Sequence, residues 1–375
     1  MKILFVATVV KTHILEFHIP YLKMLKAMGW ETAVAARNDF EDPADCVIPY
    51  CDKYFDIPFV RNPFKPGNQK AYKALKKIID EGGYDIVHCH TPVGAVIGRW
   101  AARLARKKGT KVFYTAHGFH FYKGAPLLNW LLYYPVEKFL ARKTDVIVTI
   151  TREDYKRAQK FKAGKVAYTP GVGVDTGRFS IADESRGLDF KVSLGIPADA
   201  KVLLSVGEFT PNKNHKLVLQ TLPSIPDVYY VLCGRGELME QLKSMAVALG
   251  VSDRTIFTGY RTDVEEFYNM ADIFVFPSFR EGLPVALMEA MASSLVCVAS
   301  HNRGTNDLMP ESNLLFSPKS VIELKDKLNM ALTEDMSAEV ENNKKHLKDF
   351  DINNTLSIMR SLYEEAALEK TGVSS

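Results

Sequence analysis

Residues 272–291, DIFVFPSFREGLPVALMEAM, decide the fold because a buried strand runs directly into a helix there. The apolar run of residues 272–276 is typical of a strand covered on both faces of a parallel sheet. Gly282 lets the backbone approach a ligand closely, and Pro284 suits the first helical turn, where an N–H group is expendable. We therefore expect a strand, a turn that carries the exposed carboxylate of Glu281, and the N-terminus of a helix.

The helix that follows this turn is suited to an anionic ligand. Its free N–H groups and its dipole favour a phosphate at the N-terminus. Glu289 lies eight positions after Glu281, where it can reach a neutral polar group such as a ribose hydroxyl. Two carboxylates on either side of an anion-binding turn suit a sugar diphosphate better than a protein core.

Length and composition favour a protein of two domains. A chain of 375 residues divides into two cores more readily than it packs into one. No run approaches the roughly 18 to 20 apolar residues of a membrane-spanning helix. Residues 2–9 predict a buried first strand and not a signal peptide, because Lys11 ends the apolar run. Five scattered cysteines argue against a disulfide framework and fit a reducing cytoplasm.

Charge is divided unequally between the two halves of the chain. Residues 1–170 hold 28 Lys and Arg against 15 Asp and Glu, a net +13, whereas residues 171–375 hold 20 against 29, a net −9. This asymmetry predicts an anionic partner for the basic half. The candidates are an anionic membrane, a diphosphate-bearing acceptor and nucleic acid, and the alternative is a basic surface that is simply solvated.

The first half alternates apolar runs with longer amphipathic stretches, the pattern of a doubly wound α/β domain. Strands are expected at residues 2–9, 31–36, 86–90, 111–115 and 146–150, and helices near 14–28, 68–82, 93–108, 127–142 and 151–161. Ligands of such sheets bind at the carboxyl ends of the strands. Three notable segments follow strands in this way: 11–13, 88–90 and 116–118.

A second α/β series begins after a stretch rich in Gly and Pro. Residues 168–175, and the polar segment that leads to 195–197, predict a hinge between domains. Further strands are expected at 201–207, 228–234, 256–259, 272–276 and 295–299. A last helix is expected at about 352–369.

With its surroundings, the Glu281–Glu289 pattern resembles the Glu-x7-Glu signature of the family 4 retaining glycosyltransferases, also called glycosyl transferases group 1. The resemblance covers nearly the whole chain and implies the GT-B architecture, an α/β fold with two doubly wound Rossmann-like domains facing across a cleft. It implies an acceptor-side domain at 1–180, onto which the helix 352–369 packs back, and a domain at 181–351 that binds a nucleotide-sugar donor.

The resemblance assigns roles on the donor side. Glu281 would touch the transferred sugar, Glu289 would hold the ribose, and the N–H groups around Gly282, Leu283 and Pro284–Val285 would face the diphosphate. In residues 207–214 the family pattern has a Gly, an Arg and a Lys, and the two cations clamp the diphosphate. Gly207 and Lys213 match, but Glu208 replaces the Arg and cannot clamp a phosphate. As a donor-side residue, Glu208 would instead bind a donor hydroxyl or position Lys213, and the phosphate would rely on Lys213 and the helix N-terminus or on a cation from elsewhere.

Other matching segments surround these residues. Gly234–Gly236 matches a Gly-x-Gly loop, and residues 259–261, which include Arg261, match the stretch near the nucleotide base. Gly173 stands where the family usually has Asn. The segment 115–124 is most similar to that of bacterial capsule and exopolysaccharide enzymes.

On the acceptor side, His117 follows a strand and precedes a Gly, which suits a side chain aimed into a cleft. In relatives the matching His lies near the sugar. Thr12, His13 and His90 are the other acceptor-side candidates. His88 and His90 share one face of a strand but Cys89 does not, so we expect no metal site there.

The implied reaction is retaining transfer without a metal or other cofactor, from a donor that is by default a UDP-sugar. N-acetylhexosamine is favoured slightly over hexose. Lys213 and the helix N-terminus would stabilise the departing diphosphate, and Glu281 would orient the sugar. The acceptor would be a lipid-diphosphate-linked sugar in capsule, exopolysaccharide or related glycan synthesis. No nucleic-acid reader motif is present.

Residues 119–134 are rich in aromatic side chains and are flanked by basic ones, which predicts docking on an anionic membrane. The enzyme would then be cytoplasmic and peripheral to the inner face of the plasma membrane. The alternative is that these aromatic rings fill the core. Two other functions remain open, a nucleotide-sugar 2-epimerase and a non-enzymatic sugar-binding subunit with the GT-B fold.

Overall fold

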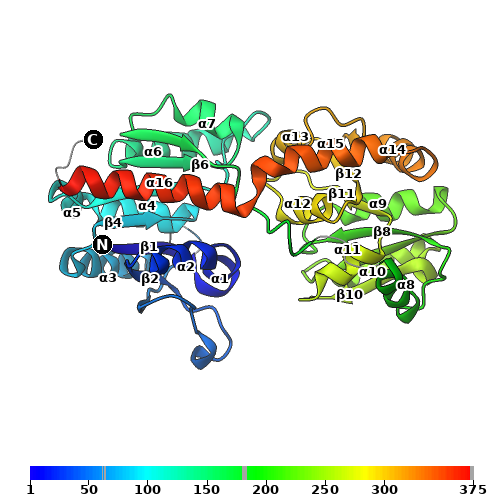
Figure 1. The fold of residues 1–375 in the computed structure, drawn as a ribbon, viewed down its shortest axis with the longest axis horizontal. Coiled ribbons are helices and arrows are strands. Elements are labelled where there is room, and N and C mark those ends of the chain that lie inside the picture. The colour runs from blue at the N-terminus through cyan, green and yellow to red at the C-terminus, as the bar shows by residue number, and fades with distance from the viewer. Residues whose placement is uncertain (61, 63–64, 180–183, 372–375) are drawn as a thin grey trace. The chain divides into compact units, whose positions relative to one another are not determined.

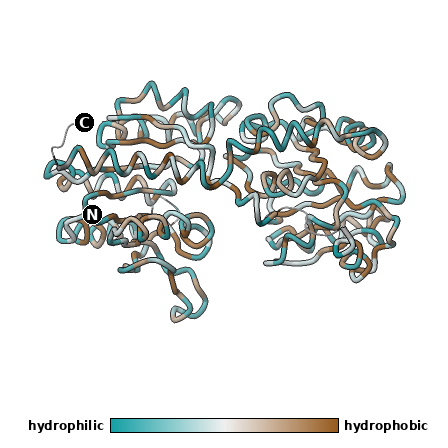
Figure 2. Tube along the Cα trace, in the orientation of Figure 1, coloured by the Kyte–Doolittle hydropathy of each residue, from teal (hydrophilic) through white to brown (hydrophobic). Residues whose placement is uncertain are grey.

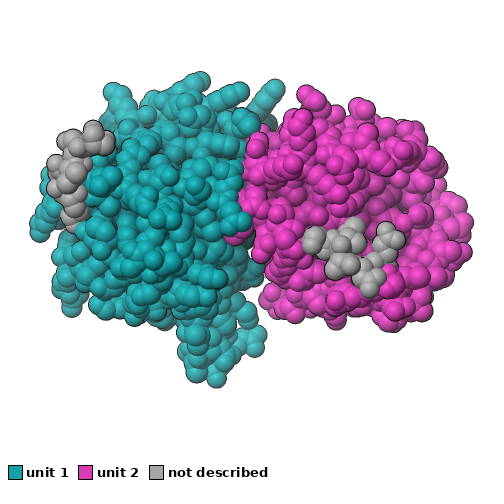
Figure 3. Space-filling view, in the orientation of Figure 1, with its two compact units in different colours: residues 1–172, 353–375 teal, residues 173–352 magenta. Residues whose placement is uncertain are grey.

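A computed structural model describes residues 1–60, 62, 65–179 and 184–371. The chain forms two compact units, which Figure 3 colours separately. Unit 1 comprises residues 1–172 and 353–375, and unit 2 comprises residues 173–352. The chain passes from unit 1 to unit 2 after residue 172 and returns to unit 1 after residue 352.

Unit 1 is built on a parallel sheet of seven strands in the order β3-β2-β1-β4-β5-β6-β7 (Figure 1). The strands are β1 Lys2–Val9, β2 Glu31–Arg37, β3 Lys53–Asp56, β4 Ile86–Cys89, β5 Lys111–Ala116, β6 Val146–Thr149 and β7 Lys165–Tyr168. All pairs are parallel. Buried apolar side chains cover both faces of the sheet, as expected when helices pack on either side.

The helices of unit 1 follow the expected pattern, with breaks. They are η1 Val10–Ile14, α1 Leu15–Phe17, α2 Ile19–Ala27, η2 Pro43–Asp45, α3 Gly67–Gly82, α4 Pro92–Ala101, α5 Arg103–Lys107, α6 Leu127–Ala141 and α7 Arg152–Ala158. The helix expected at 14–28 is divided, because η1 is a π-helical segment and Pro20 lies in the first turn of α2. The helix expected at 93–108 is likewise divided, at Ala102.

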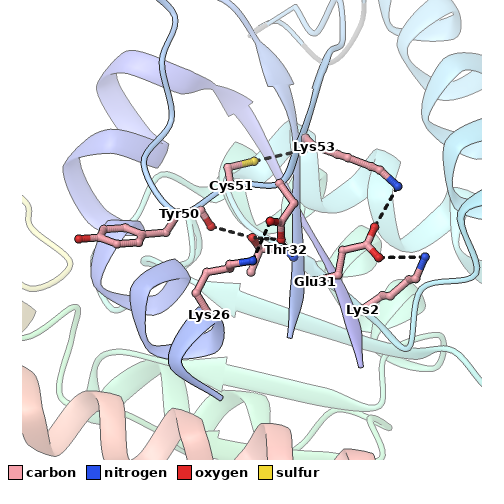
Figure 4. A network of polar contacts seen from close by, with 8 residues as sticks. Lys2, Lys26, Glu31, Thr32, Tyr50, Cys51 and Lys53 are labelled. Carbon is pink, nitrogen blue, oxygen red and sulfur yellow. Dashed lines mark hydrogen bonds and ion pairs between the residues drawn. The ribbon is translucent and has the colours of Figure 1, made fainter. Parts of the chain in front are cut away.

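Two strands of this sheet, β3 and β7, were not expected from the sequence. Both are edge strands without fully buried residues, so neither carries a long apolar run. Ionic contacts hold β3 in place (Figure 4): Glu31 of β2 pairs with Lys2 of β1 and with Lys53 of β3, each at 3.0 Å.

Unit 2 repeats the design with six parallel strands in the order β10-β9-β8-β11-β12-β13. They are β8 Lys201–Val206, β9 Val228–Cys233, β10 Thr255–Gly259, β11 Ile273–Phe276, β12 Val296–Ser300 and β13 Leu315–Phe316. Only β13, two residues long, lacks a counterpart in the sequence prediction. In Figure 2 the hydrophobic colour follows the strands of each unit, which are the buried elements.

The helices of unit 2 cover both faces of its sheet. They are α8 Glu184–Ser193, α9 His215–Thr221, η3 Leu222–Ser224, α10 Met239–Ala248, η4 Ser252–Arg254, α11 Val264–Met270, α12 Val285–Ala292, α13 Arg303–Leu308, α14 Val321–Thr333, α15 Ser337–Leu347 and η5 Lys348–Phe350.

The last helix, α16 Ile352–Thr371, packs on the sheet of unit 1. Met359, Leu362 and Tyr363 join the apolar cluster that contains Phe5 of β1. The Tyr363 hydroxyl lies 2.7 Å from Nδ1 of His88 in β4. Within the described residues, no helix has the length and apolar character needed to cross a membrane.

The surroundings of Gly173 explain why glycine stands where the family usually has Asn. Its φ of 79° lies in the left-handed region, which Gly and Asn both tolerate. A Cβ at this position would lie 2.5 Å from Cα of Ile352. The backbones are also paired there, because Val174 and Asp351 form a parallel bridge. Glycine therefore allows this close approach, which an Asn side chain would prevent.

Candidate functional site

The predicted donor residues lie on two loops that follow neighbouring strands of unit 2. Residues 207–214 follow β8, and residues 277–284 follow β11. In the strand order, β8 lies between β9 and β11, so the chain changes direction across the sheet at β8. Ligands of doubly wound sheets bind at such a switch point, outside the carboxyl ends of the strands.

Lys213 and Glu281 form an ion pair across these loops. Lys213 Nζ lies 2.9 Å from Glu281 Oε1, and the two side chains are only 23% and 14% exposed. Lys213 Nζ also lies 5.1 Å from the centre of the Phe276 ring. The expectation that Glu281 is an exposed carboxylate is therefore wrong. A cation from the adjacent loop makes its partial burial tolerable, because a buried charge needs a partner.

Hydrogen bonds to backbone carbonyls fix the two loops to each other. The Asn212 amide donates to the carbonyl of Arg280 at 2.9 Å, and the Phe279 N–H donates to the carbonyl of Asn212 at 2.8 Å. Asn214, which has a φ of 56°, donates from its amide to the carbonyl of Pro277. Lys213 is thus held between two anchored asparagines, which favours a fixed position for its charge.

Helix α12 begins directly after Pro284. Pro284 has an extended conformation and is the N-cap residue, so Val285 is the first helical residue. The first N–H groups of any helix lack intrahelical partners, which keeps the anion-binding character that the sequence predicts for residues 282–285. Leu283 and Pro284 are buried, whereas Gly282 and Val285 are partly exposed.

Two residues near this turn were not identified from the sequence. Arg303, at the start of α13, donates from Nε to the carbonyl of Glu281 at 3.1 Å. A Cβ at Gly304 would lie 2.1 Å from the carbonyl oxygen of Gly282, so only glycine lets α13 approach the turn so closely. A lone Arg-Gly pair carries no distinctive signal in sequence, and its importance comes from the packing of α13 on residues 281–284.

Glu289 lies one helical turn inside α12 and is partly exposed. Its Oε2 accepts a 2.8 Å hydrogen bond from the Tyr268 hydroxyl. Burial, reinforced by Glu289, holds the pKa of Tyr268 well above its ordinary value, so the hydroxyl remains a donor. Tyr268 therefore orients the carboxylate of Glu289.

The remaining donor-side candidates occupy the same edge of the sheet but differ in their surroundings. Gly207 lies beneath Lys213, since a Cβ there would be 3.6 Å from Lys213 Cε. The side chain of Glu208 is exposed. Arg261 follows β10 and pairs with Asp263, with Nε 2.9 Å from Oδ1. Arg261 thus carries a partly neutralised charge.

In unit 1, the acceptor-side histidines gather at the corresponding edge. His13 lies in η1 after β1, His90 follows β4, and His117 follows β5. The order β2-β1-β4-β5 makes this the switch point of the first sheet. His13 Nε2 lies 3.2 Å from Nε2 of His18, a residue that the sequence prediction did not include, and His90 Nδ1 lies 3.3 Å from His117 Nε2.

Burial keeps the histidines of this cluster uncharged. It lowers the pKa of His117 to about 4 and holds the pKa values of His13, His18 and His90 well below the ordinary value, with smaller contributions from neighbouring histidines at these three. Burial also lowers the pKa of His88 to about 3. The cluster can therefore offer lone pairs and N–H groups, but it supplies no positive charge near neutral pH.

Thr12 lies at the rim of this edge. Its side chain is exposed, and its hydroxyl is 3.4 Å from Asp39 Oδ2. The N–H of Lys11 donates to Asp39 Oδ1 at 2.6 Å. Asp39 thus holds the loop that carries Thr12 beside the histidines.

The aromatic stretch 119–134 divides between core and surface. Phe119 and Phe121 are buried, and Trp130, Tyr133 and Tyr134 pack partly against the core. These aromatic rings therefore pack in or against the core, as the alternative to membrane docking predicts. Four leucines of α6, Leu127, Leu128, Leu131 and Leu132, are exposed instead.

Comparison with known proteins identifies the family. The model of glycosyl transferases group 1 matches residues 188–347, and that of glycosyltransferase family 4 matches residues 21–178. The chain is 43% identical over 314 residues to the protein EpsD of Bacillus subtilis (strain 168), covering 82% of this chain and 81% of EpsD. The chain belongs to the family 4 glycosyltransferases.

Further relatives support this assignment. The chain is 32% identical over 267 residues to the Escherichia coli UDP-Gal:alpha-D-GlcNAc-diphosphoundecaprenol alpha-1,3-galactosyltransferase, covering 68% of each protein. Among solved structures, Anabaena Alr3699/HepE in complex with UDP and glucose matches with a TM-score of 0.79 and 19% identity, covering 97% of this chain and all of that one. This similarity shows the expected fold, two Rossmann-like units of the GT-B class.

Proposed function

We propose that this glycosyltransferase moves a sugar, with retention of configuration, from a UDP-sugar to a hydroxyl of a lipid-diphosphate-linked sugar in exopolysaccharide or capsule synthesis. N-acetylhexosamine is the favoured sugar and hexose the second. The Lys213–Glu281 pair beside the N-terminus of α12 carries the proposal. The E. coli relative, whose name specifies a UDP-linked donor and a diphosphoundecaprenol acceptor, supports the two substrate classes.

The donor would bind across the two loops of unit 2. Its diphosphate would lie at the N-terminus of α12 and draw Lys213 away from Glu281, because two phosphates attract an ammonium more strongly than one carboxylate does. Glu281 would then be free to orient the sugar and offset positive charge at its anomeric carbon. Glu289, oriented by Tyr268, would accept a hydrogen bond from the ribose.

Departure of the diphosphate would need positive charge, because negative charge grows on it in the transition state. Lys213 supplies one cation. Arg303 is the cation that compensates for Glu208, since it donates to the carbonyl of Glu281 at the same turn, whereas Glu208 is exposed. With these groups at the diphosphate, transfer would proceed without added Mg²⁺ or Mn²⁺.

The acceptor would bind to unit 1, where Thr12, His13 and His90 surround the switch point. His117 would hydrogen-bond the transferred sugar through Nδ1, because its Nε2 faces His90. Uncharged rings suit this task, since they can accept or donate a hydrogen bond to a hydroxyl.

We further propose that unit 1 docks on an anionic membrane, where a lipid-linked acceptor resides. The α6 surface consists of apolar side chains that are 37–75% exposed: Leu127, Leu128, Leu131, Leu132, Val136 and Phe139 of α6, with the Trp100 ring 5.8 Å from that of Phe139. The other face of α6 packs on the core. A helix that is apolar all round is suited to burial, and here the outer face would be buried in lipid.

Basic side chains border the α6 surface. Lys143 Nζ lies 5.2 Å from the ring centres of both Trp100 and Phe139, and Arg103 Cζ lies 4.7 Å from Trp100. Lys138 and Arg142 are exposed on the same helix end. Amphipathic rings and cations together suit the headgroup region, where each Lys or Arg contributes roughly 1 kcal/mol.

Liposome co-sedimentation tests the docking. Binding should require anionic lipid, weaken with salt, and be lost when Leu128 and Leu131 are both replaced by Ser. The control is Val247→Ser, which removes a side chain that is equally exposed but lies on α10 of unit 2. Equal binding to neutral vesicles, or unchanged binding of the double variant, would contradict docking through α6.

The transfer itself is tested with labelled UDP-sugars and lipid-diphosphate-linked acceptors, without added divalent cations. Wild-type protein should form a glycosylated lipid with one donor class. A product obtained only with added Mg²⁺ would contradict the role given to Lys213 and Arg303. Interconversion of the donor sugar without an acceptor would identify an epimerase instead.

A further inference from the structure

Four histidines from three separate segments of unit 1 meet at one point. Each of His13, His18, His90 and His117 offers a ring nitrogen, and these four nitrogens all lie within 4.8 Å of one another. His13 and His18 lie around η1 and α1, while His90 and His117 end β4 and β5. We propose that this four-histidine cluster binds a transition-metal ion of the zinc class.

The distances agree with this interpretation. Two nitrogen ligands at about 2.0–2.1 Å from a tetrahedral zinc lie about 3.3–3.4 Å apart. His13 Nε2 and His18 Nε2 are 3.2 Å apart, and His90 Nδ1 and His117 Nε2 are 3.3 Å apart. Two edges of the tetrahedron therefore already have the required length, and the other pairs, all within 4.8 Å, would have to close to about 3.4 Å.

The ring nitrogens on the far sides can take up the protons that ligation would displace. Each close pair now holds one proton between its nitrogens, and a metal would need both lone pairs, so that proton must move to the other nitrogen of a ring. Among the described residues, His18 Nδ1 and His90 Nε2 are buried without a hydrogen-bond partner, so both can carry a proton. Both rings border a small cavity that Thr115, Thr169 and Tyr363 also line.

His88 shows by contrast what a structural histidine looks like in this core. Both of its nitrogens have partners, since Nδ1 lies 2.7 Å from the Tyr363 hydroxyl and Nε2 lies 2.8 Å from Thr115 Oγ1. Its ring lies 4.0 Å from that of His90, and Phe5 stacks on His90 from another side. These contacts fix the orientation of His90, as neighbouring groups do for metal ligands.

The chemistry of the donor set selects the ion. Four uncharged imidazoles without a carboxylate or thiolate suit zinc, copper or nickel and do not suit magnesium or calcium, which prefer oxygen ligands. A bound ion would join the π-helical segment η1 to the ends of β4 and β5. Such π segments often occur at functional sites.

The metal site shares His13, His90 and His117 with the proposed acceptor side of the transfer, whereas the groups that meet the departing diphosphate lie in unit 2. If both hold, a metal on His117 Nε2 would leave the ring proton on Nδ1, and His117 would act toward the sugar only as a donor. The sequence prediction of no metal considered His88, Cys89 and His90, which are neighbours in sequence. The structure instead brings His90 together with His13, His18 and His117.

The first test uses the whole protein without a histidine tag. After purification, elemental analysis should find about one zinc-class ion per chain. Metal-free protein titrated with Co²⁺ should develop the visible absorption of a tetrahedral ion without thiolate charge-transfer absorption, which excludes Cys46 and Cys51 as ligands. Absence of both a stoichiometric metal and a Co²⁺ spectrum would overturn the site.

The second test replaces one ligand. His13→Ala should weaken Zn²⁺ binding by at least about 100-fold, and Zn²⁺ should no longer raise its melting temperature. His346→Ala in α15 of unit 2 is the matched control and should bind as wild type does. Equal affinity of His13→Ala and wild type would overturn the site even if some metal binds elsewhere.

Discussion

The two sheets have the same switch-point topology but carry different chemistry at it. In unit 1 the switch lies between β1 and β4 and is lined by buried histidines that are uncharged. In unit 2 it lies between β8 and β11 and holds the Lys213–Glu281 ion pair beside a helix N-terminus. The topology thus provides the location of a site, and the few residues after each strand decide whether it suits a neutral group or an anion.

The largest expected effect is on the charged site. Lys213→Ala should lower the rate constant of transfer by about 10²–10³, because positive charge is lost where negative charge develops, while donor affinity falls less. The control is Lys216→Ala, which removes an exposed lysine three residues away. Steady-state kinetics and calorimetry separate the two quantities. Equal losses in affinity and in catalytic efficiency, with an intact rate constant, would place Lys213 in ground-state binding only.

The second effect concerns the nucleotide. Glu289→Ala should weaken UDP binding by about 1–3 kcal/mol, the cost of losing a hydrogen bond to a carboxylate. Calorimetry with UDP and with its 2′-deoxy analogue tests the ribose assignment, since the variant should discriminate less between them. Tyr268→Phe, which keeps the carboxylate and removes only the hydroxyl 2.8 Å from it, should have a smaller effect. Unchanged UDP affinity in Glu289→Ala would rule out the ribose contact.

The smallest expected effect is a difference between the two units in how much stability they lose at low pH. A histidine whose folded pKa lies below its unfolded value of about 6.5 stays neutral when folded, so stability falls as pH drops below 6.5. For His88, with a pKa of about 3, the loss at pH 5 is roughly 2 kcal/mol. Five described histidines of unit 1 are lowered in this way against one, His215, in unit 2.

The greater loss of stability in unit 1 at low pH can be tested by hydrogen exchange. Exchange of the metal-free protein is measured at pH 7 and pH 5 and corrected for the intrinsic rates. Protection of β1, β4 and β5 should fall more than protection of β8 and β11. Equal losses in the two sheets would mean that burial of these histidines does not govern acid stability.

The sequence predicts the central strands well because they are buried on both faces and form apolar runs, as in β1 and β11. It misses β3, β7 and β13, because short or half-covered strands lack that pattern. Their places are set by neighbours, as Glu31 of β2 sets that of Lys53.

The sequence pattern identifies the candidate residues, but it does not predict which of them are in contact. Residues 213 and 281 are 68 positions apart, and their pairing follows only from the adjacency of β8 and β11. The meeting of His13 and His18 with His90 and His117 depends likewise on β1 lying beside β4. Gly304 matters because α13 approaches the carbonyl of Gly282, and nothing in a single sequence reports that distance.

The most direct test of the charged site as a transferase centre compares wild type with Glu281→Gln, which keeps the side-chain shape and removes its charge. Each protein is incubated with labelled UDP-sugars and a lipid-diphosphate-linked sugar, and the anomeric configuration of the product is determined by NMR. Wild type should transfer one sugar with retention, and Glu281→Gln should bind UDP normally yet transfer at least about 10²-fold more slowly. Transfer at the wild-type rate by Glu281→Gln, or an inverted product, would contradict the account.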